Sequence, residues 1–325
     1  MAEQTLKPDS KKFDFQYLFS RYATIGALLL VFLLFSIIAD KFLETNNLIN
    51  IVQQVSTLAI VAFGLTIAMA AGDFDLSVGS VAGLAGILGT GLLVNEYNLF
   101  SAILLALLVG AIFGLVNGII STKLGIPSLI VTLGTSSIAI GINFMYSEGR
   151  AIYGNLPESF TTLGRGDVLG LPMPIIIMAI IGVIVYLFLN NTRSGRYIYA
   201  VGGNATASKL SGIKVSQYRI LSLMLSGIGA AIAGIVLAAR LGSGQPTAGE
   251  SFLMDSLAAV FLGMTTIKVG QPNVIGTLVG VILIGVINNG LNLLGLPFYI
   301  QDIAKGAIMI LAVAFAASKN ELKFF

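Results

Sequence analysis

Long apolar segments alternate with short polar connections along almost the whole of this 325-residue chain. A helix that spans a membrane needs about 20 predominantly apolar residues, with some latitude. Ten segments meet or approach that length, and the third, eighth and tenth are short or interrupted. They are residues 22–39, 55–71, 78–94, 100–120, 126–146, 173–189, 220–239, 253–267, 274–294 and 302–316. The pattern predicts an all-α polytopic membrane protein with about ten transmembrane helices.

Composition agrees with this prediction and narrows the chemistry. Hydrophobic residues make up 56% of the chain and charged residues 10%, whereas soluble domains carry about 25% charged residues. Cysteine and histidine are both absent, which removes disulfides, Cys/His metal sites and imidazole bases. The basic residues lie in short loops and not on one face, so nucleic acid is not an expected partner. We expect no catalytic residue, no metal site and no cofactor in this chain.

The basic residues also predict an orientation. If the N-terminus is inside and ten spans alternate, thirteen of the 18 Lys and Arg residues lie inside, four lie outside, and Lys305 lies within the tenth span. Such an excess marks the cytoplasmic side of a membrane. We therefore expect a cytoplasmic tail over residues 1–21, one transmembrane domain over 22–316, and a second cytoplasmic tail over 317–325.

The most basic connection is the loop 190–219, which has five Lys or Arg residues and no acidic one. Its centre has the marks of a short helix between glycines: Asn204 as N-cap, helix over 205–210, and Gly212 to end it. Such a helix suits contact with a soluble partner, through residues that include Ala207 and Leu210. The alternative is a solvated basic turn that serves only to set the orientation.

Residues 72–80, GDFDLSVGS, interrupt an apolar run with Asp73 and Asp75. Aspartate inside a membrane helix costs a few kcal/mol on insertion scales and is usually functional. We predict that Asp75 is the N-cap of the third helix and that Ser77 lies beside it at a break in the helix, where free N–H groups face a polar cavity. A tight turn at the membrane surface is the alternative.

Amides and glycines mark further positions within the apolar segments. Asn117, Asn288 and Asn292 are candidates to line a pathway for a polar solute, although interhelical hydrogen bonding is the commoner role of such amides. Gly114 belongs to a small-xxx-small run that predicts a close helix contact. Residues 242–251 form either a surface turn or a re-entrant segment that places Gln245 in a cavity.

The chain also contains a weak internal repeat. Residues 114–118 parallel 285–290, and Asp75 parallels Asp255, each near the start of a short span. In the ten-span topology the two units run in opposite directions, as in the inverted repeats of many transporters. Chance similarity between glycine-rich apolar helices is the alternative explanation.

No G-x-x-x-x-G-K-[ST] sequence occurs, so the chain has no P-loop. No His-rich or carboxylate-rich proton relay is present either. If the chain moves a solute uphill, we expect the work to arrive through the basic loop from another subunit.

Four motifs together resemble the permeases of ribose, xylose and galactoside type ABC importers. Residues 72–80 resemble the family's G-x-x-D-L-S-V-G-S signature, and 200–213 its cytoplasmic coupling segment. Residues 239–249 are similar to its outer segment, and 288–295 to its C-terminal helix motif. The chain departs from the family over 264–273, where a glycine-rich run is usual, and this leaves the particular sugar open.

The resemblance implies a membrane permease subunit of an ATP-driven importer for a monosaccharide or related small polar solute, in the bacterial inner membrane. It implies a second permease copy, a cytoplasmic ATPase that binds ATP, and an extracytoplasmic solute-binding protein. A stand-alone secondary carrier or channel is the alternative. The coupling residues that it implies are Gly202, Gly203, Asn204, Ala207, Leu210, Ser211 and Gly212. The pathway residues that we single out are Asp73, Asp75, Ser77, Asn117, Gln245, Asn288 and Asn292.

Overall fold

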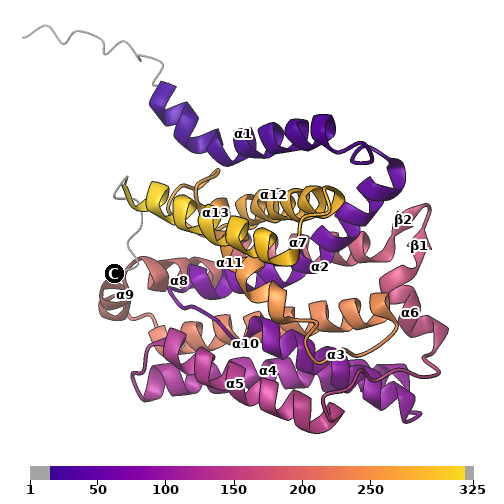
Figure 1. The fold of residues 1–325 in the computed structure, drawn as a ribbon. Helices are drawn as coiled ribbons and strands as arrows, with labels where there is room; N and C mark the ends of the chain where they lie inside the picture. Colours follow the sequence, from indigo (N-terminus) through magenta and orange to yellow (C-terminus); the bar gives the residue numbers. More distant parts are fainter. Residues whose placement is uncertain (1–14, 319–325) are drawn as a thin grey trace, which may run out of the picture.

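The computed structural model describes residues 15–318, and most of this stretch is helical (Figure 1). The helices are α1 Phe15–Ile38, α2 Thr45–Ala70, α3 Val78–Val94, α4 Leu99–Lys123, α5 Ser128–Ser147, α6 Glu158–Arg165, α7 Met173–Asn191, α8 Arg193–Gly203, α9 Ala205–Leu210, α10 Val215–Leu241, α11 Glu250–Met264, α12 Val274–Leu293 and α13 Phe298–Ser318. Strands β1 Asp167–Val168 and β2 Leu171–Pro172 form an antiparallel hairpin.

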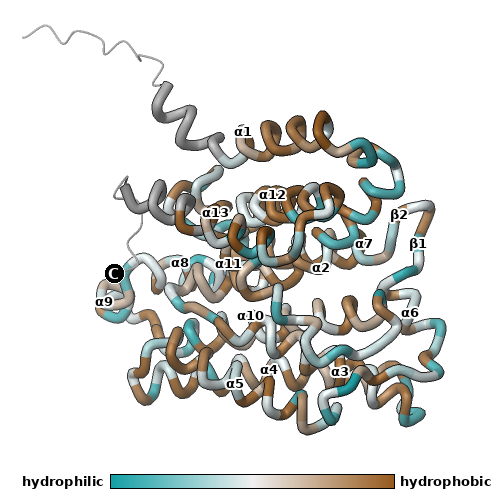
Figure 2. Tube along the Cα trace, in the orientation of Figure 1, coloured by the Kyte–Doolittle hydropathy of each residue, from teal (hydrophilic) through white to brown (hydrophobic). Residues whose placement is uncertain are grey.

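Most of the long helices run along one common direction, which gives the bundle two distinct ends (Figure 1). Helices α8 and α9 lie at one end, called here the α8 end, and α6 with the β1–β2 hairpin lies at the opposite, α6 end. Hydrophilic residues gather mainly at the connections and hydrophobic residues along the helices, as Figure 2 shows. This distribution is that of a bundle that spans a membrane.

Each of the ten predicted apolar segments overlaps one helix. Within residues 15–318, six helices are long and apolar enough to cross a membrane, namely α2, α4, α5, α7, α10 and α12. The segments α6, α8 and the hairpin were not predicted, because they are short and lie in polar connections. Of the two predicted tails, residues 1–14 and 319–325 lie outside the described residues, and α1 already begins at Phe15.

Helix α10 lies at the centre of the bundle and packs against α2, α3 and α4. Glycines allow its backbone to approach α4 closely. A Cβ built on Gly110 would lie 2.3 Å from the carbonyl oxygen of Gly227, and one on Gly114 would lie 2.2 Å from that of Leu223. The predicted close contact at Gly114 is therefore confirmed, and its partner is α10.

Between α10 and α11 the chain turns back into the bundle. Gly244 lies beside Ile87 on α3, and Gly249 lies beside Gly79, eight residues nearer the start of that helix. At 1.5 Å per residue this is a descent of about 12 Å. Residues 242–249 are thus a re-entrant segment, and α11 begins within the bundle and not at its end.

Candidate functional site

The helical structure is interrupted between α2 and α3, and we call this interruption the break. Its first charged residue, Asp73, is neutralised by Arg219 of α10. Asp73 is fully buried. Its carboxylate accepts hydrogen bonds from Nη2 of Arg219 at 2.5 Å and from Nε at 2.9 Å. The same Nη2 also donates to the hydroxyl of Ser121 on α4, at 3.1 Å. Asp73 therefore joins the break to α10 through a bidentate ion pair with Arg219.

Asp75 forms a network without any basic partner among the described residues. Its Oδ1 accepts from the backbone N–H of Ser77 at 3.0 Å and from the Ser77 hydroxyl at 2.5 Å. Asn117 on α4 donates to that hydroxyl at 3.0 Å, and Thr135 on α5 donates to Asn117 at 2.6 Å. The Oδ2 atom of Asp75 and the hydroxyl of Ser226 on α10 are buried and have no hydrogen-bond partner among the described residues. The network thus connects the break to α4 and α5.

The prediction that Asp75 caps α3 is wrong. Helix α3 begins at Val78, with Ser77 in the N-cap position and no side-chain cap hydrogen bond. The Asp75 side chain instead turns back onto the N–H two residues further on, as aspartate does in an Asx turn. The surface-turn alternative is also wrong, because both Asp73 and Asp75 are completely buried.

Helix α5 supplies polar side chains that satisfy the broken backbone, and this role was missed in the sequence. The N–H of Phe74 donates to the hydroxyl of Ser128 at 3.1 Å, and that of Leu76 donates to Thr132 at 3.0 Å. Ser136 shares a hydrogen bond with Ser80 at 3.0 Å. The hydroxyl spacing of four residues along α5 was the available signal, since it places these groups on one helix face. Backbone that is not helical is tolerated at membrane depth only when it is satisfied in this way.

A second polar cluster lies between α11, α12 and α13, in the half of the bundle nearer the α6 end. Asp255 is 6% exposed. Its Oδ1 lies 3.1 Å from Nζ of Lys305, and its Oδ2 accepts from the amide of Asn288 at 3.1 Å. Asn292, one turn beyond Asn288, accepts from Gln301 at 2.9 Å. The sequence had marked Asp255 only as the counterpart of Asp75, and it did not pair it with Lys305.

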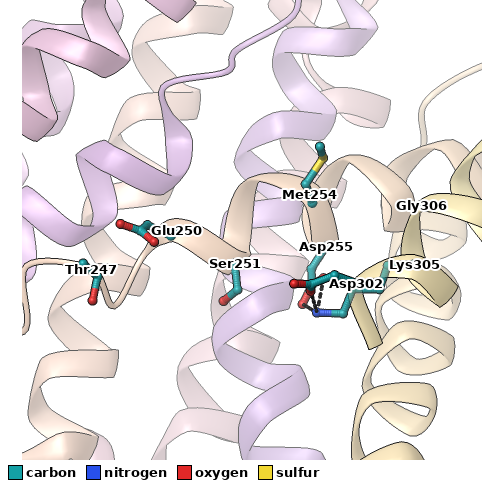
Figure 3. Close-up of a pocket in the computed structure, with 8 residues that line it drawn as sticks. All are labelled: Thr247, Glu250, Ser251, Met254, Asp255, Asp302, Lys305 and Gly306. Atoms are coloured by element: carbon teal, nitrogen blue, oxygen red, sulfur yellow. Dashed lines mark hydrogen bonds and ion pairs between the residues drawn. The ribbon is translucent and has the colours of Figure 1, made fainter. Parts of the chain in front are cut away.

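Two cavities meet at this cluster. One has a volume of about 560 Å³ and is lined by residues of the re-entrant segment, α11 and α13. Figure 3 shows Lys305 of α13 directed at the carboxylates of Asp255 and Asp302. The other cavity, of about 240 Å³, is lined by polar groups that include Asn288, Asn292 and Arg240. Ser251, Asp255 and Lys305 line both.

The predicted pathway residues therefore fall into two groups. Asp75, Ser77 and Asn117 come together in the buried network beside α3, and Asp73 lies two residues before it, paired with Arg219. Asn288 and Asn292 come together in the second cluster, at a cavity. Gln245 belongs to neither group: it lies on the re-entrant segment and donates to Ser243 at 3.2 Å.

The amide of Asn289 has a purely interhelical role. Asn289 and Asn47 of α2 exchange two hydrogen bonds, of 2.8 and 3.0 Å. Asn289 points away from the side shared by Asn288 and Asn292, as their spacing predicts.

The α8–α9 corner has the local structure that the sequence predicts. Asn204 accepts from the N–H of Ala207 at 2.8 Å and caps α9, which runs over Ala205–Leu210. Gly212 follows with a φ of +79°, in the left-handed region that ends helices. Leu210 is 86% exposed, and Gly203, Ala207 and Ser211 are exposed as well. The predicted N-cap, helix and glycine stop are confirmed.

Helix α8 anchors this corner to the rest of the bundle. A Cβ on Gly202 would lie 2.1 Å from the carbonyl oxygen of Ala70, so only glycine permits this contact with the end of α2. Tyr199 donates to the carbonyl oxygen of Pro272 at 2.8 Å, and burial raises the pKa of its phenol to about 12. The phenol is therefore a neutral donor at any physiological pH.

Together these features define a polytopic helical membrane protein with a broken helix, a re-entrant segment and a polar cavity in its interior. The sequence profile of the branched-chain amino acid transport system permease component family matches residues 47–313. The chain belongs to this family, and it is a membrane transport component and not an enzyme.

Curated relatives match over nearly their full lengths. The ribose import permease protein RbsC of Bacillus subtilis is 37% identical over 98% of this chain and 100% of its own. The D-allose transport system permease protein AlsC of Escherichia coli is 33% identical over 94% of both. The L-arabinose transport system permease protein AraH of the same organism is 35% identical over 96% of this chain and 94% of its own.

One solved structure, of a metal-chelate type ABC transporter in an inward-facing conformation, aligns with 91% of this chain and 96% of its own, at 14% identity and a TM-score of 0.43. At that TM-score the alignment supports no conclusion about this chain.

Proposed function

We propose that the chain is the membrane-spanning permease subunit of an ATP-driven importer for a monosaccharide or related small polar solute. The observation that carries this proposal is the full-length similarity to subunits named for ribose, D-allose and L-arabinose transport. A bacterial inner-membrane location follows from the same relatives. A stand-alone carrier is not favoured, because these relatives are named as parts of import or transport systems.

The cytoplasmic ATPase docks on the α8–α9 corner in this proposal. The support is chemical: Leu210 is 86% exposed at the end of a bundle, between the basic residues Lys209 and Lys214. An exposed leucine on a capped, rigid helix gains stability when a partner covers it. ATP is bound by the partner, because this chain has no P-loop.

The coupling residues surround this exposed leucine. Asn204 fixes the start of α9, Gly212 fixes its end, and Gly202 fixes α8 on the bundle. Gly203, Ala207 and Ser211 present the exposed surface.

We place the solute pathway along the two polar groups. The buried network of Asp75, Ser77 and Asn117, with Asp73 beside it, borders the pathway from the α3 side. Asn288 and Asn292 line the cavity on the other side, and Gln245 lies on the re-entrant segment near α3. A neutral sugar is bound by hydroxyl, amide and carboxylate groups of this kind.

The topology that we propose has ten spans, an inverted repeat and a cytoplasmic N-terminus. Helix α3 begins near the α8 end, where Gly72 lies beside Gly202, whereas α11 ends there, close to Lys268, which donates to Asn190. The opposite directions of α3 and α11 support the proposed inverted repeat of Asp75 and Asp255. Helix α1 starts and α13 ends toward the α8 end (Figure 1), so the first and last described helices support a cytoplasmic N-terminus on the side of the basic corner.

A second permease copy and an extracytoplasmic solute-binding protein complete the assembly. Helix α5 has two glycines, Gly134 and Gly141, at which an added Cβ would meet nothing within 4 Å. Glycines in membrane helices usually lie where another helix approaches closely, which supports a further chain against α5. The binding protein then docks at the α6 end, opposite the ATPase.

Reconstitution tests this function. The permease, its ATPase and its binding protein in liposomes should take up ribose, D-allose or L-arabinose only when ATP is present at the ATPase. Ala207→Arg should leave insertion intact and abolish both ATPase co-purification and uptake, because charge and bulk enter the docking contact. Uptake without ATP, or unchanged co-purification of the variant, would contradict the proposal.

A further inference from the structure

Four polar side chains from four different helices meet at the 240 Å³ cavity, which we call the polar cavity. They are Arg240 of α10, Asp255 of α11, Asn288 of α12 and Lys305 of α13. Asp255 and Lys305 lie within predominantly apolar helices, where ionisable residues are rare and usually mark a solute pathway, and Arg240 lies in the last turn of α10.

Some of the bonding capacity of these groups is already used within the cluster. Asp255 is neutralised by Lys305, with Nζ 3.1 Å from Oδ1, and it accepts from Asn288 at 3.1 Å. The remaining capacity is two acceptors and one donor: the Oδ1 atoms of Asn288 and Asp255 and the Nη1 atom of Arg240 are buried and have no hydrogen-bond partner among the described residues, although Asp255 Oδ1 is paired in charge with Lys305. A buried polar atom without a partner is destabilising, so these atoms favour a ligand or solvent that satisfies them.

The rest of the wall is mixed. Leu58, Leu237 and Phe252 supply apolar surface, and further polar side chains line the same cavity, namely Gln54, Thr57, Ser251, Asn292 and Gln301. Sites for small molecules combine apolar surface with convergent polar groups and usually measure about 300–1,000 Å³ for ligands of drug size. At about 240 Å³ the polar cavity suits a smaller molecule.

We infer that the polar cavity is a contact site for a neutral polyhydroxylated solute of monosaccharide size. Each hydroxyl both donates and accepts, so adjacent hydroxyls can donate to Asn288 Oδ1 and accept from Arg240 Nη1. The C–H faces of the same solute contact the apolar part of the wall. The inference rests on the proposed importer function and adds a binding site, with Arg240, Asp255 and Lys305 as parts that the function alone does not assign.

The charges of the cavity disfavour a cation. A cation would have to compete with Lys305 for Asp255, and Arg240 adds a further positive charge to the lining, which repels it. Between a neutral sugar and a sugar acid, the neutral class follows from the proposed importer function. The paired Asp255 and Lys305 can bind hydroxyls without changing their charge.

Site-directed labelling tests the inference on the full chain in lipid nanodiscs. The chain has no cysteine, so Ser251→Cys, at a position that lines both cavities, gives a single reporter for a small polar thiol reagent. Ribose, D-allose or L-arabinose should slow this labelling at millimolar concentration. Ser159→Cys is the matched control, because Ser159 is exposed on α6 and lines neither cavity; the sugars should not alter its labelling.

Two further variants separate binding from structure. Asn288→Leu, in the reporter background, removes one free acceptor and should raise the sugar concentration for half protection about tenfold or more. The double variant Asp255→Leu with Lys305→Met removes both charges together, which avoids an unpaired buried charge. It should fold and also lose protection.

The outcomes are decisive for the site and its ligand. Absence of protection by sugars in the Ser251→Cys chain would overturn the site. Protection in the two further variants that equals the protection in the Ser251→Cys chain would overturn it as well. Stronger protection by leucine or by a sugar acid than by the neutral sugars would overturn the ligand class. Because labelling needs no partner or ATP, a complex that imports sugar without protection at Ser251→Cys would refute this inference and leave the importer function standing.

Discussion

The contact between α4 and α10 allows a sharp prediction about stability. A Cβ at Gly114 would lie 2.2 Å from the carbonyl oxygen of Leu223 and 2.7 Å from the Cα of Met224. Because ordinary contact begins at 3.4 Å, Gly114→Ala should force the two helices apart by roughly 1 Å, which a close-packed interior does not absorb freely. Gly110 and Gly118 lie in the same contact, so the separation weakens packing along the whole line.

The magnitude follows from two opposing effects. Overpacking costs about 1–3 kcal/mol, and a clash with backbone atoms belongs at the upper end. Alanine returns about 1 kcal/mol as the better helix former. We therefore expect a net loss of about 2 kcal/mol for Gly114→Ala.

Gly26→Ala is the matched control, since an added Cβ at Gly26 in α1 would meet nothing within 4 Å. It should gain up to about 1 kcal/mol from helix propensity alone.

Thermal unfolding of the purified variants in one detergent measures the difference. At about 2 °C per kcal/mol for a chain of this size, the melting temperatures should differ by about 6 °C, with Gly114→Ala the lower. If Gly114→Ala melts at or above Gly26→Ala, then α4 and α10 do not make this contact in the membrane protein.

Three further predictions address the break and the corner. Asp75→Asn keeps an acceptor for Ser77 and should retain most of the sugar uptake, whereas Asp75→Ala should lose most of it; equal uptake by the two variants would exclude the hydrogen-bond role. Asp73→Asn should lower the unfolding free energy by about 3 kcal/mol because it leaves Arg219 without its carboxylate in a mostly buried place, and Asp73→Leu combined with Arg219→Met should recover part of that loss in the same melting assay. Asn204→Ala should cost about 1 kcal/mol of local helix stability through loss of the α9 cap, seen as faster amide exchange over residues 205–210 with little change elsewhere; uniform exchange would show that the cap is unimportant.

Much of the fold could be predicted from the sequence because membrane helices are determined by local hydrophobicity. All ten apolar segments overlap a helix, and the cap at Asn204 and the stop at Gly212 depend only on neighbouring residues. Similar local reasoning failed at Asp75, since a carboxylate can accept from its own turn as easily as from the first turn of a helix.

The site could be predicted only in part, because its contacts join distant parts of the chain. Arg219 was counted as a loop residue of the basic corner, yet it neutralises Asp73, 146 residues away. Lys305 was placed within the tenth span without a partner, and Asp255 is 50 residues from it. A hydrophobicity pattern identifies buried polar residues as costly, but it does not say which helices will meet.

The contact between Gly202 and the end of α2 has a mechanical consequence. It is made by two backbones, with no side chain between them. A side chain at such a place can change rotamer and absorb a displacement of an ångström or so, but a peptide backbone held in a helix has no comparable slack. A displacement of the α8–α9 corner therefore moves the end of α2, just before Asp73, by a similar amount.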